Sequence, residues 1–336
     1  MEAKSISLDT KPGATLRISI YFPPCTPGTH VSNTLVVFLN GLVLPRSSWT
    51  ESINHLLALR QSSSQPTPAL LSYDRYGQGD SDPDPTDPPD TPYGHDLLTS
   101  AADLYHLLTQ VVSPTLLPTT NLIFVCNSIG CALARLYAAA HPDYNIAGLL
   151  FLDSMVANSD YVSLFPDPDG GSQITLPPDV SVESLRHARA MFTKFFHPTV
   201  PNAERLDRRR LAELLPDADR PVLPTRKDNG GRTPRLVVVG HDWDEFAEQC
   251  ETGSMAVQKS VINAYLNPAW GAYNEGLTRL VQHPDNIGSE EDQVKIAKGC
   301  GHFIQRDDPL FVATEINSFL NELAEQDVAD LWMYEC

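Results

Sequence analysis

The chain has 336 residues, of which 42% are hydrophobic and 20% charged, a composition that fits a globular protein and excludes disordered chains and small disulfide scaffolds. Its 24 Lys and Arg against 42 Asp and Glu give a net charge of −18, which disfavours nucleic acid and anionic membranes as partners. The six cysteines form no CxxC pair and no zinc-binding pattern with histidine, so we expect free thiols and no metal site.

The first residues, MEAKSISLDTKPG, lack the basic and apolar regions of a secretory signal, and no stretch approaches 18 uninterrupted apolar residues. These features predict a protein of the cytoplasm, where thiols stay reduced. The glycines Gly77 and Gly79 have neither GxGxxG spacing nor a Walker lysine, so we expect no nucleotide cofactor. The oligomeric state stays open, and a homo-oligomer is one of the alternatives.

Short apolar or β-branched runs recur along the chain, and stretches with helical spacing lie between them, which indicates an α/β fold. Most runs are apolar at successive residues, as in parallel strands that helices cover on both faces. The first run, Thr15–Phe22, and the segment Ser5–Leu8 before it predict an antiparallel hairpin at the sheet edge. The predicted strands after Ser5–Leu8 are Thr15–Phe22, Thr34–Leu39, Ala69–Tyr73, Asn121–Cys126, Ala147–Leu152, Arg235–Val239 and Gln293–Ala297.

Helical spacing between and after these strands predicts a mostly parallel, doubly wound sheet of eight strands, with its core in residues 1–153 and 235–336. The core helices are expected at Trp49–Leu59, Leu97–Val112, Cys131–Ala140 and Pro309–Leu323. Residues 154–234, after the sixth strand, are too many for a simple crossover. They contain predicted helices at Val182–Phe196 and Asn202–Leu215. We expect a helical lid over the carboxyl edge of the sheet; an amphipathic pair packed on the core is the alternative.

A serine lies in the segment Cys126–Gly130 (CNSIG), directly between an apolar strand and an alanine-rich helix. Backbone segments crowd such a turn, so it needs small residues two places before and after the serine, as found here. The turn would expose the Ser128 hydroxyl and aim the N–H of Ile129 at an adjacent oxyanion. We therefore predict that Ser128 is a nucleophile, the alternative being a serine that only caps the helix.

A serine nucleophile needs a general base, and histidine suits because its pKa lies near neutral pH. His302 lies in the glycine-rich segment Gly299–Phe303 (GCGHF), just beyond the final predicted strand. That position places it at the carboxyl edge of the sheet, together with Ser128. His241 and His141 are the rival bases, and His141 precedes a proline at the opposite edge.

These motifs together resemble the α/β-hydrolase family, over about Thr34–Leu152 and Arg235–Leu323. Besides the serine turn and the histidine loop, Leu39–Leu42 (LNGL) is similar to the family's oxyanion loop. Ser72–Pro83 (SYDRYGQGDSDP) is similar to the segment that follows the family's fourth strand. The resemblance implies the α/β-hydrolase fold and chemistry at a carbonyl group.

The resemblance also suggests individual roles around the site. It implies that the amide of Leu42 is the second oxyanion donor beside Ile129. Asn40 and Asn127 stand where the family usually has histidine, and we expect both to line the pocket. Asp74 and Arg75 are expected to stabilise their loop through an ion pair or turn bonds rather than to take part in catalysis.

Three acids are eligible to orient the histidine. Asp153 stands at the end of the sixth strand, whereas Asp242 and Asp244 follow the seventh, the more usual family position. The family's habitual spacing there places Trp243 in the acid's slot. Some α/β-hydrolases take the acid from the sixth strand, and the run LLFLDS resembles such a branch. We favour Asp153, then Asp242, then Asp244; an Asp153 that only bonds neighbouring loop amides is the structural alternative.

The sequence thus predicts a serine hydrolase that cleaves an ester, thioester or lactone of a mid-sized apolar molecule through an acyl-enzyme on Ser128, with no cofactor. Serine at this turn disfavours epoxide and haloalkane cleavage, which need a carboxylate nucleophile. The chain resembles α/β-hydrolases of fungal biosynthetic pathways, which implies a substrate from secondary metabolism. The alternatives are a lyase or cyclase acting at the same site, with His302 alone as base in one version, and a non-catalytic ligand-binding homologue.

Overall fold

The computed structural model describes residues 1–24, 33–171, 174–225, 233–281 and 293–333. Its strands are β1 (Glu2–Ile6), β2 (Leu16–Tyr21), β3 (Thr34–Leu39), β4 (Ala69–Tyr73), β5 (Asn121–Ser128), β6 (Ile146–Ser154), β7 (Arg235–His241) and β8 (Lys295–Ala297). They form one eight-stranded sheet in the order β1-β2-β4-β3-β5-β6-β7-β8. β2 is antiparallel to both its neighbours, and all the other pairs are parallel. The predicted mostly parallel sheet with an edge hairpin is confirmed.

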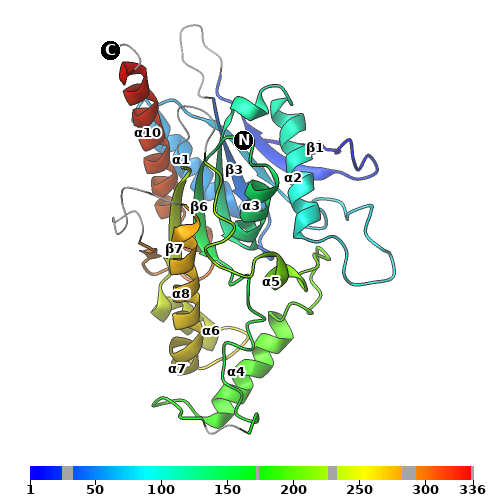
Figure 1. The fold of residues 1–336 in the computed structure, drawn as a ribbon, viewed down its shortest axis with the longest axis vertical. Coiled ribbons are helices and arrows are strands. Elements are labelled where there is room, and N and C mark those ends of the chain that lie inside the picture. Colours follow the sequence, from blue (N-terminus) through cyan, green and yellow to red (C-terminus); the bar gives the residue numbers. More distant parts are fainter. Residues whose placement is uncertain (25–32, 172–173, 226–232, 282–292, 334–336) are drawn as a thin grey trace.

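Helices cover both faces of this sheet, with α1 (Thr50–Ser62) and α10 (Pro309–Met333) on one side and α2 (Leu97–Val112) and α3 (Ile129–Ala140) on the other (Figure 1). The central strands are buried on both faces, which explains their continuous apolar sequence. α2 buries Leu97, Leu104 and Leu108 at helical spacing, and each buried leucine stabilises the fold by about 1.5–3 kcal/mol.

Residues 154–234 contain α4 (Val182–Phe195) and the short α5 (Leu211–Leu214). The prediction of α4 was correct to within one residue, because its buried residues repeat at helical spacing and Ser181 caps its first turn. The predicted helix Asn202–Leu215 is wrong. Arg205 has a positive φ of 58°, and the Asp207 amide donates to the His95 carbonyl at 2.8 Å, so tertiary contacts hold this backbone out of a helix.

The chain between β7 and β8 adds α6 (Trp243–Thr252), α7 (Lys259–Val261), a π-helical turn (Ile262–Leu266) and α8 (Asn267–Leu277), none of which was predicted. Figure 1 shows these helices with α4 beside one end of the sheet. α7 contacts α4. Two separate insertions, one after β6 and one after β7, therefore build the region beside this end of the sheet. Within the described residues, none of the helices combines the length and apolar character that crossing a bilayer requires.

Candidate active site

Ser128 occupies a strained turn between β5 and α3, with φ 55° and ψ −122°. A non-glycine residue adopts this conformation only when the surroundings enforce it. The turn passes so close to β3 that a Cβ on Gly130 would lie 2.4 Å from the Leu39 carbonyl oxygen. Although Ser128 stands at the N-cap of α3, its hydroxyl makes no capping hydrogen bond. The hydroxyl is therefore not used by the helix, and Ser128 lines a cavity at the carboxyl edge of the sheet.

His302 and Asp153 are in direct contact: Nδ1 of His302 lies 2.6 Å from Oδ2 of Asp153. His302 comes from the loop between β8 and α9 (Ile304–Asp307), whereas Asp153 is the second-last residue of β6 and fully buried. An acceptor at Nδ1 keeps the proton on that nitrogen and leaves Nε2 free to receive one. The arrangement therefore orients His302 as a general base.

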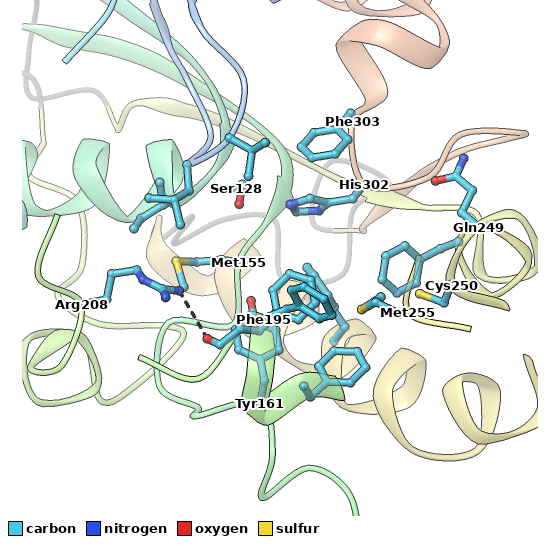
Figure 2. A pocket seen from close by; sticks show the side chains of 17 residues that line it. Ser128, Met155, Tyr161, Phe195, Arg208, Gln249, Cys250, Met255, His302 and Phe303 are labelled. Atoms are coloured by element: carbon cyan, nitrogen blue, oxygen red, sulfur yellow. Dashed lines mark hydrogen bonds between the residues drawn. The ribbon is translucent and has the colours of Figure 1, made fainter. Parts of the chain in front are cut away.

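Ser128 and His302 line the same cavity, and Figure 2 shows the imidazole ring of His302 beside the Ser128 hydroxyl. In the described part of the chain no hydrogen bond joins the two side chains. Such bonds are often long or poorly aligned in triads without substrate and tighten when substrate binds. The geometry thus brings together the three residues that the sequence favoured, Ser128, His302 and Asp153.

The rival acids have other partners. Asp242 caps α6 by accepting from the Asp244 amide at 3.1 Å, and its other oxygen accepts from the Gly299 amide at 3.2 Å. Asp244 is exposed and lies 3.4 Å from the Lys259 ammonium. The rival base His141 stacks on Tyr105 with ring centroids 4.4 Å apart and does not line the cavity. None of these three side chains reaches Ser128 or His302 in the described structure.

The expected oxyanion donors, Leu42 and Ile129, both line the cavity next to Ser128. Ile129 is the first residue of α3, so its N–H has no partner in a preceding turn. Gly41 fixes the approach of the other loop, because a Cβ there would lie 3.2 Å from the Cβ of Ser128. Both residues therefore lie beside the nucleophile, as the resemblance to the family's oxyanion donors requires.

Side chains from the SYDRYGQGDSDP segment hold this oxyanion loop from behind. Arg75 donates to the carbonyls of Asn40 at 2.8 Å and Gly41 at 2.9 Å, and Gln78 donates to the Gly41 carbonyl at 2.8 Å. With its carbonyls engaged on one side, the loop directs its amides to the other. Arg75 also forms a buried two-bond ion pair with Glu204, both bonds 2.9 Å long. Arg75 was expected to stabilise its own loop, and its hydrogen bonds show that it also holds the oxyanion loop.

The expectation that Asn40 and Asn127 line the pocket is not met, since both are buried behind the residues that do. Asn40 accepts from Trp49 Nε1 at 2.8 Å and donates to the Tyr73 carbonyl at 2.8 Å. Asn127 donates to the Leu152 carbonyl and to the His302 carbonyl, each at 3.0 Å. Asn127 therefore ties the histidine loop to the serine turn. The side-chain amides of Asn40 and Asn127 thus stabilise the site without lining the cavity, because each donates to backbone carbonyls of neighbouring segments.

Glu204→Gln is expected to lower the free energy of unfolding by about 3–5 kcal/mol, because it leaves the buried Arg75 guanidinium without a charged partner. Urea denaturation followed by circular dichroism measures the change. The control is Glu213→Gln, which removes an exposed pair with Arg210 and should change stability by less than about 0.5 kcal/mol. Equal stability of the two variants would contradict a structural role for the Arg75–Glu204 pair.

Asp153 contacts a second histidine, His241, whose Nδ1 lies 2.8 Å from Oδ1 of Asp153. Burial by itself would raise the pKa of Asp153, but the charge and hydrogen bonds of His241, together with His302, lower it to about 2. Burial would likewise lower the pKa of His241, yet the adjacent Asp153 carboxylate raises it above its usual value. Asp153 is therefore a carboxylate at neutral pH, as its role beside His302 requires.

The cavity has a volume of about 260 Å³ and an apolar wall. Phe192 and Phe195 of α4 contribute to it, together with Phe196, which directly follows the helix. Figure 2 labels Phe195 among the lining side chains. The only cationic side chain with a permanent charge among the described lining residues is Arg208, and it donates to the carbonyls of residues 196, 197 and 200 beyond the end of α4. Such a lining favours an apolar ligand.

One group of side chains among the described residues has the spacing of metal ligands: Asp84, Asp87 and His95. None of them lines the cavity. The ammonium of Lys11 already lies 2.5 Å from Asp84 Oδ2, and an Arg205 nitrogen lies 3.9 Å from Asp87 Oδ2. The chain itself therefore supplies the cations for these carboxylates.

The thiols of Cys126, Cys131, Cys250 and Cys300 are free, and Cys25 and Cys336 lie outside the described residues.

Sequence reasoning missed several residues that complete the site. His241 was considered only as a rival base, and Asn267, Trp270 and Glu204 were not considered. Trp270 donates to the Ser154 carbonyl at 2.7 Å, and its ring packs edge-on against both His241 and His302, with centroids 5.3 Å from each. The sequence signal for His241 was its place beside the predicted acids at the end of β7.

Comparisons with known proteins concern the family and the fold. The model of the alpha/beta hydrolase family matches residues 36–315. An epoxide hydrolase from Vigna radiata has 13% identity over 96% of this chain and 98% of that chain, with a TM-score of 0.51. A thermophilic esterase from Thermogutta terrifontis has 14% identity over 96% and 99%, with a TM-score of 0.50. A laboratory-evolved potato epoxide hydrolase has 15% identity over 96% and 99%, with a TM-score of 0.52.

A search of curated proteins finds no match to this sequence. The likeness to the solved structures, at such low identity, concerns the fold alone. Epoxide hydrolases and an esterase share this fold, so the fold leaves the bond that is cleaved open. The side chains of the site have to decide that question.

Proposed function

Because this chain belongs to the alpha/beta hydrolase family, we propose that it is a serine hydrolase for an ester, thioester or lactone of a mid-sized apolar metabolite. One observation carries the proposal: the Ser128 hydroxyl and the His302 ring share an apolar cavity, and Asp153 holds His302 Nδ1 at 2.6 Å. A hydroxyl nucleophile suits acyl transfer, because it forms an ester that water can hydrolyse. Epoxide opening in this family relies on a carboxylate at the same turn.

The proposed reaction has two steps. Ser128 Oγ attacks the substrate carbonyl while His302 Nε2 takes its proton, and the amides of Leu42 and Ile129 bind the oxyanion. His302 then protonates the leaving alcohol or thiol as the carbonyl bond to it breaks. Water, deprotonated by His302, attacks the resulting acyl-enzyme and releases the acid, which restores Ser128. Asp153 stabilises the imidazolium in both steps.

The apolar cavity supports an acyl or ring substituent as the part of the substrate that is recognised. In this proposal residues 154–234 act as a lid, because α4 and the residue that follows it supply three phenylalanines to the cavity wall. The substrate is a small molecule of secondary metabolism, and the reaction takes place in the cytoplasm without a cofactor, nucleic acid or membrane.

A fluorophosphonate probe tests the nucleophile directly. An activated serine attacks the phosphorus and expels fluoride, so we expect a covalent adduct that peptide mass spectrometry locates on Ser128. His302→Ala should slow labelling by about 10²–10⁴-fold, because general base assistance is lost. An unlabelled wild-type protein, or an adduct on another residue only, would contradict the proposal and favour a ligand-binding protein.

The cavity wall predicts a preference for long acyl chains. For p-nitrophenyl esters, kcat/KM should rise about fourfold per added methylene until the cavity is filled. Phe195→Ala, which removes a ring at the rim of the cavity, should lower kcat/KM about fivefold for octanoate and leave acetate unchanged. The matched control is Phe22→Ala, an exposed phenylalanine outside the cavity, which should alter neither ester. Equal rates for acetate and octanoate would contradict an acyl pocket.

A further inference from the structure

His241, the last residue of β7, is buried beside Asp153. It contacts this carboxylate through both its ring and its backbone. Its ring Nδ1 lies 2.8 Å from Asp153 Oδ1, and its backbone N–H donates to the same oxygen at 3.2 Å. Its other ring nitrogen, Nε2, lies 3.0 Å from the side-chain oxygen of Asn267. Both nitrogens of the ring therefore face an oxygen.

The Asn267 amide has a defined orientation. Its nitrogen donates to the Trp243 carbonyl at 3.0 Å, and a backbone carbonyl can only accept. The oxygen of Asn267 is consequently the atom that faces His241. An amide oxygen also only accepts, so His241 Nε2 has to carry a proton. On the other side, the carboxylate of Asp153 requires a proton on Nδ1. A histidine with a proton on each nitrogen is an imidazolium with a full positive charge.

The surroundings of His241 agree with this charge. The titratable groups near it are Asp153 on β6, Asp242 next in the chain and, beyond Asp153, His302. Lys298 is turned to Asp242, at 3.7 Å. The other contacts, from α6 and α8, are the uncharged rings of Phe246 and Trp270. Negative charge thus outweighs positive charge around the ring, and the direction of the pKa shift at His241, upwards, has the same origin.

We propose that His241 is a positioning residue that stays protonated at neutral pH, fixes the Asp153 carboxylate and offsets its charge, so that His302 releases its proton at a lower pH. The proposal rests on the proposed serine hydrolase mechanism. Oδ1 of Asp153 is bound by His241, which leaves Oδ2 to orient His302. A carboxylate without this counter-charge would hold the proton of a protonated His302 more strongly. The free enzyme would then need a higher pH to present a neutral general base.

His241→Asn tests the charge, because the asparagine amide can still donate to Asp153 but carries no charge. With p-nitrophenyl butyrate, the acid limb of the kcat/KM profile should move up by about one pH unit. A role confined to packing would lower the plateau and leave the limb in place, and that result would overturn the proposal. The matched control is His141→Asn, a histidine stacked on Tyr105 away from Asp153, which should not move the limb.

Nitrogen-15 NMR of histidine-labelled protein tests the protonation state without any turnover. At pH 8 we expect His241 to show two N–H signals with imidazolium shifts, in the wild type and equally in Ser128→Ala. Asn267→Leu removes the acceptor at Nε2, so in that variant the charged form should disappear at a lower pH than in the wild type. A neutral ring in the wild type at pH 8 would overturn the proposal. Because the Ser128→Ala arm needs no catalysis, failure of the hydrolase mechanism and failure of the imidazolium are distinguishable.

Discussion

Ser128→Ala is expected to lower kcat for p-nitrophenyl esters by about 10⁶-fold, because among the described residues that line the cavity Ser128 alone carries an aliphatic hydroxyl. The strained backbone at φ 55° belongs to the turn, so alanine should leave the fold and the cavity intact. Stopped-flow or long-time spectrophotometric assays of purified protein measure the residual rate. Binding of a non-hydrolysable ketone analogue should persist.

A matched control for this variant is Ser154→Ala. Ser154 pairs with Ser128 across β5 and β6 but donates its hydroxyl to the Met155 carbonyl at 3.1 Å. Its replacement should cost less than about tenfold in kcat, since only one neutral hydrogen bond is lost. If Ser128→Ala retained activity that His302→Ala abolished, the acyl-enzyme would be ruled out and a base-only lyase would be favoured.

Asp153→Asn is expected to lower kcat by about 10⁴-fold while the protein stays folded. Both His302 and His241 contact Asp153 through Nδ1, one on each carboxylate oxygen. An asparagine has one oxygen and one N–H donor group, so one of the two rings must lose its acceptor. If that ring is His302, it takes the tautomer with a proton on Nε2, which cannot accept a proton from serine. Steady-state kinetics at the pH optimum gives the ratio.

The comparison variants are the two rival acids. Asp242→Asn should change kcat by less than about tenfold and lower stability by about 1 kcal/mol, because asparagine can still cap α6 but has one oxygen for the two amides, of Asp244 and Gly299, from which Asp242 accepts. Asp244→Asn removes an exposed carboxylate and should alter neither quantity measurably. A loss in Asp242→Asn that matched the loss in Asp153→Asn would show that the acid had been misassigned.

The predicted core elements agreed with the structure where apolar residues ran continuously or repeated at helical spacing. The helix Leu97–Val112 and the strand Thr34–Leu39 were predicted to the residue. Their buried apolar residues follow the helix or strand pattern over the whole element, so the pattern marks both ends. Asn202–Leu215 failed because the pattern is local, whereas the backbone there is held by residues 94 and 95, more than 100 positions earlier. The helices after β7 were missed because α6 is rich in acids, and only a cap at Asp242 marks its start.

The residues of the candidate site likewise fall into those that the sequence could predict and those that it could not. Ser128 and His302 could be predicted because each needs a short glycine-containing segment next to a strand end. Asp153 could be ranked first but not fixed, since strand direction alone places three acids at one edge. The position of His241 at the end of β7 could be predicted, but its contacts with Asp153 and Asn267 could not, because they exist only after β6, β7 and α8 are packed.

The Arg75–Glu204 pair bears on how this protein can be re-engineered. Arg75 holds the carbonyls of the oxyanion loop, while its carboxylate partner comes from the segment between β6 and β7. Grafting onto this core a segment without an acid at that position would leave a buried cation behind the loop. A stable chimera of this chain therefore has to carry an acid at position 204, whatever other residues of the segment are exchanged.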